Sequence, residues 1–304
     1  MPSLRHFVRA HLGGAKAREG ERAASLPRRA VGRVYIYTVI AIFVIFAAFP
    51  FAWATITMFK ADSDLYTPSN NPFTYNKPAT LSHVKLLFND TSYLTFVRNS
   101  VVVGAVVVVI TLLLCIPAAY ALARLTGRAG QRLGVGIFLV YLVPPTLLCI
   151  PLSRVVATLG LQDSLGSLML VYPGFTVPLS TWLLTGFFKS VPRDIEEQAQ
   201  VDGYSRFGAF VRTVLPLVLP GIVTVVVFSF TLTMQDFIYS LAFVSTSSKL
   251  TISVGVPTEL VRGDVFFWQS LMAAVVIVAV PVALLYNIFL DRFIRGFTMG
   301  AVKG

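Results

Sequence analysis

The sequence predicts an all-α membrane protein with six transmembrane helices. Hydrophobic residues make up 56% of the chain and charged residues 13%, which is about half the charged share of a soluble domain. Apolar stretches recur that are long enough to cross a hydrocarbon core of about 30 Å, which takes about 20 helical residues. None of these stretches alternates apolar and polar residues with a period of two, so helices are expected and barrel strands are not.

The six spans are expected at about residues 34–59, 98–122, 133–157, 165–188, 216–240 and 270–291. They make residues 34–304 one transmembrane domain, with no room for a second, soluble domain. Residues 1–33 are expected to form a basic cytoplasmic tail. The first apolar stretch is too long for a cleaved signal peptide, and no A-x-A-like cleavage site follows it closely.

The distribution of Lys and Arg predicts the orientation in the membrane. Eighteen of the 25 basic residues lie in the tail, in the connections after the second and fourth spans, and after the last span. The acidic residues divide equally, so the net charge is +11 on this side and 0 on the other. The positive-inside rule then places both termini in the cytoplasm. This topology accounts for the basic composition, and no basic patch with interleaved aromatics predicts nucleic-acid binding.

The connections and span ends give local predictions. The external segment at about 60–96 carries prolines and aromatics, which predicts an ordered cap, either facing an external partner or packed as a lid on the chain's own helices. Asn99 or Ser100 is expected to cap the first turn of the second span, and Pro117 to bend it. Both cysteines lie inside apolar spans and no Cys/His cluster exists, so no metal site is expected.

Prolines are concentrated in the third and fourth spans, where Pro144, Pro145 and Pro173 are the main candidates for helix breaks. In lipid, a broken helix is tolerated where the freed carbonyls face protein or water. These two spans therefore either line a pathway or are kinked packing helices.

The fifth span ends near Gln235 and Asp236, and Asp236 is the only carboxylate that can lie within a span away from its cytoplasmic end. An acid at mid-depth costs about 2.5–3.5 kcal/mol on insertion scales and normally faces a bundle interior or a cavity. Counting from Pro216 places Asp236 about 20 residues into the helix, near the outer boundary, where solvation alone would explain it. Both interpretations stay open.

Residues 190–215 are predicted to form a polar elbow of two short helices between the fourth and fifth spans. Acidic residues fill the first turn, where the helix dipole favours them. Gly203 can adopt the left-handed conformation that ends a helix, and a second helix can begin at Ser205. A short acidic helix at a fixed angle to a span can act as a lever for a soluble partner. An ordinary helical loop is the alternative.

This elbow resembles the EAA loop of bacterial ABC importer permeases, whose pattern is Glu-Ala-Ala, three residues, Gly, nine residues, Ile, one residue and Leu-Pro. Gln198 replaces the first Ala, and Thr213 stands where Ile is usual. The residues that match at the family's spacing are Glu197, Ala199, Gly203, Leu215 and Pro216. Further motifs agree along residues 34–304, and the C-terminal sequence is similar to the carbohydrate branch, which includes the smaller permease subunit of the maltose importer.

The resemblance implies a type I ABC importer permease fold, a bacterial plasma-membrane location, and transport of a sugar or related polyol. It also implies a second permease subunit in a heterodimer, two copies of a cytoplasmic ATPase subunit, and an external substrate-binding protein. The chain has no GxxxxGK[ST] phosphate loop, so ATP and magnesium are expected in the ATPase subunit and this chain is not expected to be an enzyme.

The resemblance also implies roles for individual residues. Glu197, Ala199, Asp202 and Gly203 are expected to couple the chain to the ATPase: Glu197 by pairing with a basic residue or backbone donor, Ala199 by allowing close approach to the ATPase groove, and Gly203 by setting the angle between the helices. Leu215 and Pro216 complete the motif. Gln235 and Asp236 are candidate substrate contacts, since their side chains suit sugar hydroxyls.

Two other classes compete with this interpretation. A stand-alone secondary transporter would carry charge relays within several spans and matching broken helices in its two halves. A membrane-embedded enzyme would need a nucleophile, a base or metal ligands clustered at one depth. The sequence offers Asp236 as the one candidate relay and shows no such cluster.

Overall fold

The computed structural model describes residues 32–301 of the 304-residue chain. The chain divides into two compact units that meet between Ile56 and Thr57. In the first unit the structure describes one apolar helix, which begins at Gly32, continues to Met58, and has the length and hydropathy of a membrane span. The predicted first span is confirmed to within two residues at each end. The predicted basic tail, apart from residues 32 and 33, lies outside the described residues.

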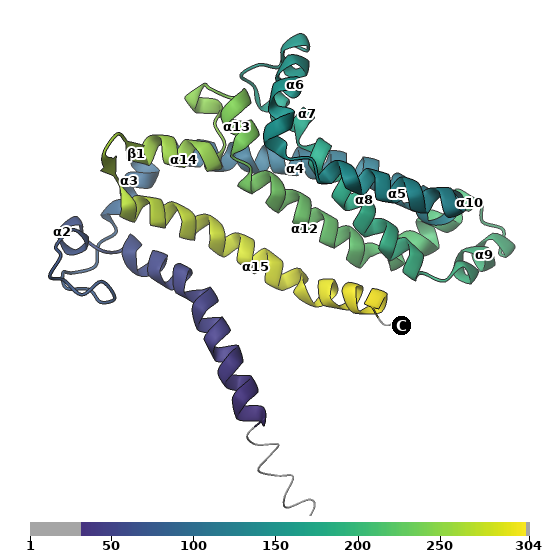
Figure 1. Ribbon diagram of the computed structural model, residues 1–304, viewed down its shortest axis with the longest axis horizontal. Helices are drawn as coiled ribbons and strands as arrows, with labels where there is room; N and C mark the ends of the chain where they lie inside the picture. The colour runs from purple at the N-terminus through teal and green to yellow at the C-terminus, as the bar shows by residue number, and fades with distance from the viewer. Residues whose placement is uncertain (1–31, 302–304) are drawn as a thin grey trace, which may run out of the picture. The chain divides into compact units, whose positions relative to one another are not determined.

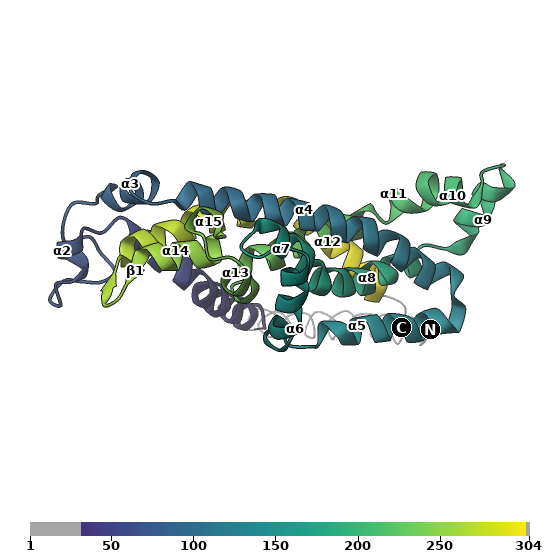
Figure 2. The same ribbon diagram turned by 90° about the horizontal axis from the view of Figure 1, so that it is seen from above.

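Four long helices run side by side in the second unit: α4 (Tyr93–Tyr120), α8 (Pro173–Ser190), α12 (Leu219–Gln235) and α15 (Trp268–Ala301) (Figures 1 and 2). α4 packs against α8 and α12, and α12 packs against α15. A Cβ atom at Gly104 of α4 would lie 2.9 Å from the ring of Phe230 on α12. The missing side chain therefore allows these two helices to approach closely.

Shorter elements connect the long helices. They are α2 (Asp62–Leu65), α3 (Ser82–Asn89), the π-helix η1 (Ala121–Leu125), α5 (Gly127–Tyr141), α6 (Pro145–Thr158), α7 (Leu165–Val171), α9 (Arg193–Val201), α10 (Arg206–Ala209), the π-helix η2 (Phe210–Val214), α11 (Leu215–Leu217), α13 (Ile238–Phe243), the 3-10 turn η3 (Ser247–Lys249) and α14 (Ile252–Leu260). Two short strands, β1 (Val261–Arg262) and β2 (Val265–Phe266), pair antiparallel, with Val261 opposite Phe266.

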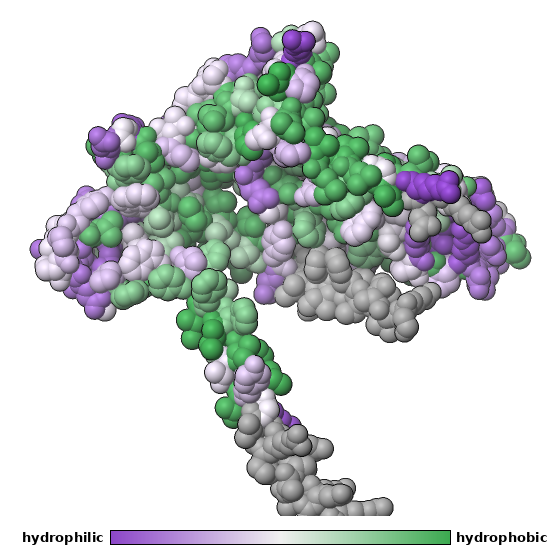
Figure 3. Space-filling view, in the orientation of Figure 1, coloured by the Kyte–Doolittle hydropathy of each residue, from purple (hydrophilic) through white to green (hydrophobic). Residues whose placement is uncertain are grey.

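The second unit is polar at both ends of the long helices and apolar between them. Figures 1 and 2 place α9 and α10 at one end, and α2, α3 and the β1–β2 hairpin at the other. Hydrophilic side chains gather at these two ends, whereas hydrophobic side chains cover the helices between them (Figure 3). This distribution is the one expected of a chain that crosses a membrane, since only the ends of the helices then meet water.

Within the described residues, four helices are long and apolar enough to cross a membrane, and six spans result when two bent pairs each count as one. The third span is bent by 89° between Arg132–Tyr141 and Pro145–Thr158. The fifth is bent by 71° between Arg206–Leu217 and Leu219–Gln235. Counted in this way, the number of spans agrees with the six predicted, and α12, the longer part of the fifth span, begins three residues later than the span was expected to begin.

The predicted breaks occur in both the third and the fourth spans, between α5 and α6 and between α7 and α8, but only the third span is sharply bent. Pro144 lies at the break between α5 and α6 in an extended conformation, with φ −59° and ψ 131°. The fourth span is a single candidate span over Leu165–Ser190. Pro173 lies in the first turn of α8, where a missing N–H costs nothing because that group has no partner within the helix.

The second span begins at Tyr93, five residues before its predicted start. Asn99 and Ser100 therefore lie inside the helix, and the prediction that either caps it was wrong. The Asn99 side chain donates hydrogen bonds of 3.0 Å to the carbonyls of Ser248 and Leu250. Ser100 Oγ accepts the N–H of Ile252 at 2.8 Å. Both side chains thus provide hydrogen-bond partners for backbone groups just before α14 and at its first residue. These hydrogen bonds hold the loop before α14 against the second span.

The segment after the first span, which the sequence predicts to be external, is ordered around a buried lysine. Lys60 is 1% exposed, and its ammonium donates to the carbonyls of Asn71 and Thr74 at 3.1 and 2.7 Å. It lies 3.6 Å from Asp64 Oδ2. Burial raises the pKa of Asp64, but hydrogen bonds from Asn76 and the charge of Lys60 hold that pKa below its ordinary value. The predicted cap is confirmed.

Hydrogen bonds between the cap and other elements of the chain show what the cap covers. The Tyr66 hydroxyl donates to the carbonyl of Phe266 in the hairpin at 3.0 Å. Gln269 of α15 donates from Nε2 to Asp62 Oδ1 at 2.9 Å. The segment is thus packed on the chain's own elements, as the lid interpretation proposed, and an additional external partner stays a prediction.

Candidate functional site

The elbow between the fourth and fifth spans begins with helix α9, which ends at a left-handed glycine. Gly203 has φ +94°, a conformation that costs a residue with a Cβ about 1–2 kcal/mol or more. The N–H of Tyr204 donates to the carbonyl of Ala199, and the N–H of Gly203 to that of Gln200, both at 3.1 Å. These two bonds form a Schellman motif, which satisfies the last carbonyls of the helix. The predicted role of Gly203 as the stop is confirmed.

The second half of the elbow starts at the predicted residue and ends in a bend. Ser205 is the N-cap of α10, and its Oγ accepts the N–H of Gly208 at 3.1 Å. The helix then changes to π-type hydrogen bonding in η2 and meets Pro216 in the first turn of α11. The 71° bend follows before α12. Because proline cannot donate the usual helical bond and crowds the preceding turn, Pro220 in the first turn of α12 accounts for a bend at Val218.

A buried carboxylate attaches α9 to the second span. Glu196 is 7% exposed, and the Tyr120 hydroxyl donates a hydrogen bond to its Oε1. Arg124 Nε lies 3.6 Å from Glu196 Oε2, with both side chains less than a tenth exposed. Arg124 Nη2 donates to the carbonyl of Val191 at 2.7 Å. We call these three side chains, Tyr120, Arg124 and Glu196, the polar clamp.

An aromatic cluster lies beside the polar clamp. The ring of Tyr120 lies 4.4 Å from that of Phe210 and 5.7 Å from that of Phe188, measured between centroids. Phe188 and Phe210 are also in contact, at 6.1 Å. These rings come from α4, α8 and η2, so the cluster joins the second span, the fourth span and the second half of the elbow. Such ring pairs add about 0.5–1.5 kcal/mol each beyond the burial of their area.

The clamp and the cluster make the elbow a rigid extension of the spans. A force on α9 reaches α4 through buried polar contacts, and a force on η2 reaches α4 and α8 through packed rings. Packed interiors transmit displacement because they are nearly incompressible. The arrangement is therefore suited to moving as one piece. Within the described residues, no group of three or more His, Cys, Asp or Glu side chains could hold a metal ion.

The predicted coupling residues are not all on one surface. Glu197 and Asp202 are exposed on α9 and at its C-cap, and Gly203 follows on the surface. Ala199 is only 4% exposed and faces the chain itself. Its small side chain thus allows α9 to approach η2, against which this helix packs. Leu215 is half-buried in the first position of α11, and Pro216 is exposed.

Sequence reasoning missed the polar clamp, although its signal is in the sequence. Tyr120 and Arg124 are four residues apart near the C-terminal end of the second span, a spacing that places two side chains on one helical face. Three carboxylates are available in α9, at 194, 196 and 197. Which of them turns inward is decided by the angle at which α9 leaves the span, and that angle is a tertiary property.

The substrate-pathway candidates are distributed over two places. Pro144 and Pro145 are exposed at the bend of the third span. Asp236 follows the last residue of α12 and accepts hydrogen bonds from the Tyr172 hydroxyl at 2.8 Å and the N–H of Ser240 at 3.2 Å. Pro173 directly follows Tyr172 at the start of α8, and Gln235 is exposed. Asp236 therefore connects the end of α12 to the junction of α7 and α8 in the fourth span, and a contact with substrate stays a prediction.

Comparisons with known proteins place these features in a family. Residues 91–299 match the family model described as "Binding-protein-dependent transport system inner membrane component". The inner membrane ABC transporter permease protein YcjP of Escherichia coli (strain K12) is 31% identical over 280 residues, which cover 91% of this chain and 99% of the relative. The sulfoquinovosyl glycerol transport system permease protein SmoH of Agrobacterium fabrum (strain C58 / ATCC 33970) is 34% identical over 258 residues, covering 84% and 89%.

A solved structure has the same fold. A chain in the crystal structure of a bacterial ABC transporter involved in the import of the acidic polysaccharide alginate matches with a TM-score of 0.74 at 18% identity, and the match covers 86% of this chain and 96% of that chain. The polar clamp and the whole elbow lie inside the region matched by the family model.

Proposed function

The chain belongs to the family of binding-protein-dependent transport system inner membrane components, and from this membership we propose that it is a permease subunit of an ATP-driven ABC importer for a sugar or related polyol. The relatives are named as ABC or transport-system permeases, and one carries the name of a sugar glycoside, sulfoquinovosyl glycerol. A stand-alone secondary transporter, the alternative class, has no support among them.

The observation that carries the proposal is the elbow itself, an exposed acidic helix attached to two spans by the polar clamp and the aromatic cluster. A helix that only connected two spans would not need a buried ion pair at its base. We assign its exposed face to contact with a cytoplasmic ATPase. Glu197, Asp202 and Gly203 lie on that face, and Ala199 keeps α9 close to the rest of the elbow.

The full importer would contain a second permease subunit paired with this one, two copies of the ATPase, and an external substrate-binding protein that delivers the ligand. ATP and magnesium would bind in the ATPase, since this chain contains no phosphate-binding loop and is not itself an enzyme. Closure of the ATPases would draw the two elbows together, and the spans attached to them would open the pathway outward. Hydrolysis would reset it.

The proposed location is the bacterial plasma membrane, with both termini in the cytoplasm. The Lys and Arg excess lies on the side of the elbow, which is also where an ATPase would have to bind. The cap formed by the external segment then faces the side from which the binding protein delivers its ligand.

The direct test is purification of the chain from its own membranes in mild detergent, followed by identification of what accompanies it. We expect an ATPase subunit to co-purify, and uptake of the transported solute to stop when the ATP site of that subunit is inactivated. Uptake that persists with an inactive ATPase would instead identify a secondary transporter.

A further inference from the structure

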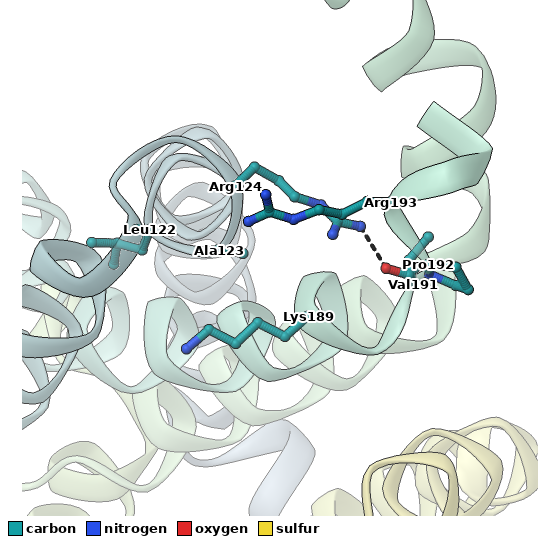
Figure 4. Close-up of a pocket in the computed structure, with 8 residues that line it drawn as sticks. Leu122, Ala123, Arg124, Lys189, Val191, Pro192 and Arg193 are labelled. Carbon is teal, nitrogen blue, oxygen red and sulfur yellow. Dashed lines mark hydrogen bonds between the residues drawn. The ribbon is translucent and has the colours of Figure 1, made fainter. Parts of the chain in front are cut away.

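A basic cavity lies at the base of the elbow, where η1, the end of α8 and the start of α9 meet. Its volume is about 530 Å³, which falls within the range of about 300–1,000 Å³ that is usual for small-molecule sites. Figure 4 shows the side chains of Arg124, Lys189 and Arg193 around it. The lining residues are Leu122, Ala123, Arg124, Gly127, Lys189, Val191, Pro192 and Arg193.

The lining contains three basic residues and no acidic residue. In the part of the chain that the structure describes, neither Lys189 nor Arg193 forms an ion pair. Arg124 is more than nine-tenths buried, and its Nε–H has no hydrogen-bond acceptor among those residues. Its one nearby charge, Glu196, lies 3.6 Å away. The cavity therefore holds more positive charge than the surrounding carboxylates neutralise, which favours an anion.

Backbone groups add to this preference. α9 begins at Arg193, directly after the cavity-lining Pro192, and no side chain caps its first N–H groups. The N-terminus of a helix carries unpaired N–H donors and a partial positive charge, and it attracts phosphate groups. Asp194 and Glu197 on the same helix are exposed but do not line the cavity.

The position of the cavity indicates the source of the anion. Arg124 lies one residue before the end of the span Tyr93–Leu125, and Lys189 one residue before the end of the span Leu165–Ser190. The cavity is thus at the level where the spans leave the hydrocarbon core, which is the level of the lipid headgroups. It is on the side with the excess of Lys and Arg, and basic pockets between spans on that side suit anionic headgroups.

We propose that this cavity binds the phosphate of an anionic phospholipid headgroup from the cytoplasmic leaflet. The phosphate accepts hydrogen bonds from Lys189 and Arg193, and the guanidinium of Arg124, which already faces Glu196 and the carbonyl of Val191, adds positive charge to the wall of the cavity. The bound headgroup then joins η1, α8 and α9, which makes it a further brace between the elbow and two spans. The proposal rests on the proposed orientation, in which the elbow lies on the cytoplasmic side of the membrane, and it is independent of what the chain transports.

The test is native mass spectrometry of the full-length chain, purified in detergent with the subunits that accompany it and titrated with phosphatidylglycerol. The double variant Lys189→Gln/Arg193→Gln is expected to bind this lipid about 25-fold more weakly, since each basic residue contributes about fivefold, or about 1 kcal/mol. The charge-conserving variant Lys189→Arg/Arg193→Lys is expected to restore most of the binding. Phosphatidylcholine, which has no net charge, is expected to bind weakly to all of them.

A matched control separates the cavity from the overall charge. Arg132→Gln/Arg206→Gln removes two exposed basic residues that do not line the cavity, and it is expected to bind phosphatidylglycerol as the unaltered chain does. Equal binding by the cavity variant, or equal loss in the control, would overturn the proposal. Displacement of the lipid by millimolar inorganic phosphate would also overturn the proposal and would indicate that the cavity binds a soluble phosphate compound. The proposal would equally be overturned if the unaltered chain retained no phosphatidylglycerol.

Discussion

Glu196 connects the elbow to the second span through both oxygens of its carboxylate. One oxygen accepts the Tyr120 hydroxyl and the other faces Arg124. With both charged side chains buried, removing one partner leaves the other charged and unpaired in a poorly solvated place. That loss typically costs about 3–5 kcal/mol, more than the net contribution of the pair itself.

We therefore expect Glu196→Ala to destabilise the chain by about 3 kcal/mol, measured by chemical unfolding in detergent. Arg124→Ala should cost a similar amount, and the double variant should cost clearly less than the sum, since it leaves no unpaired charge. Glu197→Ala, one position along and exposed, should stay within about 0.5 kcal/mol of the unaltered chain. Additive losses in the double variant would show that the two side chains do not interact.

The turn between α9 and α10 is the element that fixes the direction of the elbow. A Cβ atom at Gly203 would meet nothing within 4 Å, and its φ is +94°. Space therefore imposes no penalty on a side chain at this position, but the backbone conformation does. A substitution at Gly203 therefore tests the backbone conformation of the turn without disturbing the packing around it.

We expect Gly203→Ala to lower uptake while the chain still inserts and assembles, because a relaxed turn would change the direction in which α9 points. Gly203→Pro should have a larger effect, since proline fixes φ near −65°. Glu197→Lys should likewise separate uptake from ATP hydrolysis by reversing a charge on the exposed face. The measurements are solute uptake and ATPase activity in reconstituted vesicles.

Gly186→Ala is the matched control for the turn. Gly186 lies in α8, also has no atom within 4 Å of an added Cβ, and has no unusual φ. Alanine is favoured over glycine in a helix, so this variant should transport normally. Normal uptake by Gly203→Ala, Gly203→Pro and Glu197→Lys alike would remove the coupling role from the elbow.

The second unit is polarised, with the elbow at one end of its long helices and the cap at the other (Figures 1 and 2). The charge distribution predicts the orientation, because the side richer in Lys and Arg is usually retained in the cytoplasm during insertion. Val201 at the end of α9 is 87% exposed and Val265 in the hairpin is 56% exposed. These positions report on opposite faces of the membrane.

Single cysteines at these two positions, in a chain whose Cys115 and Cys149 are replaced by Ala, test the orientation. In right-side-out membrane vesicles, a membrane-impermeant thiol reagent should label Val265→Cys and spare Val201→Cys. Inside-out vesicles should give the reverse pattern. Labelling of Val201→Cys from the outside would place the elbow on the external face and exclude an ATPase partner there.

The sequence by itself determined the number of spans and the two helices of the elbow, and its charges predict the orientation. Span number follows from the length of the hydrocarbon core, and the elbow depends on local chemistry at Gly203 and Ser205. Local signals of this kind act within a few residues, so they can be predicted without the rest of the chain. The same locality explains why Pro216 marked the end of the elbow correctly.

Where local sequence signals compete, only the tertiary structure decided which of them prevailed. Pro173 interrupts the fourth span between α7 and α8 without a sharp bend, whereas the fifth span, where no break was predicted, is bent by 71°. Asn99 and Ser100 bind a loop about 150 residues away along the chain rather than their own helix. Glu196, and neither of its acidic neighbours, meets Arg124 because the spans fix the angle at which α9 departs. Each outcome depends on which distant groups come within hydrogen-bonding distance, and only the packed bundle of helices sets those distances.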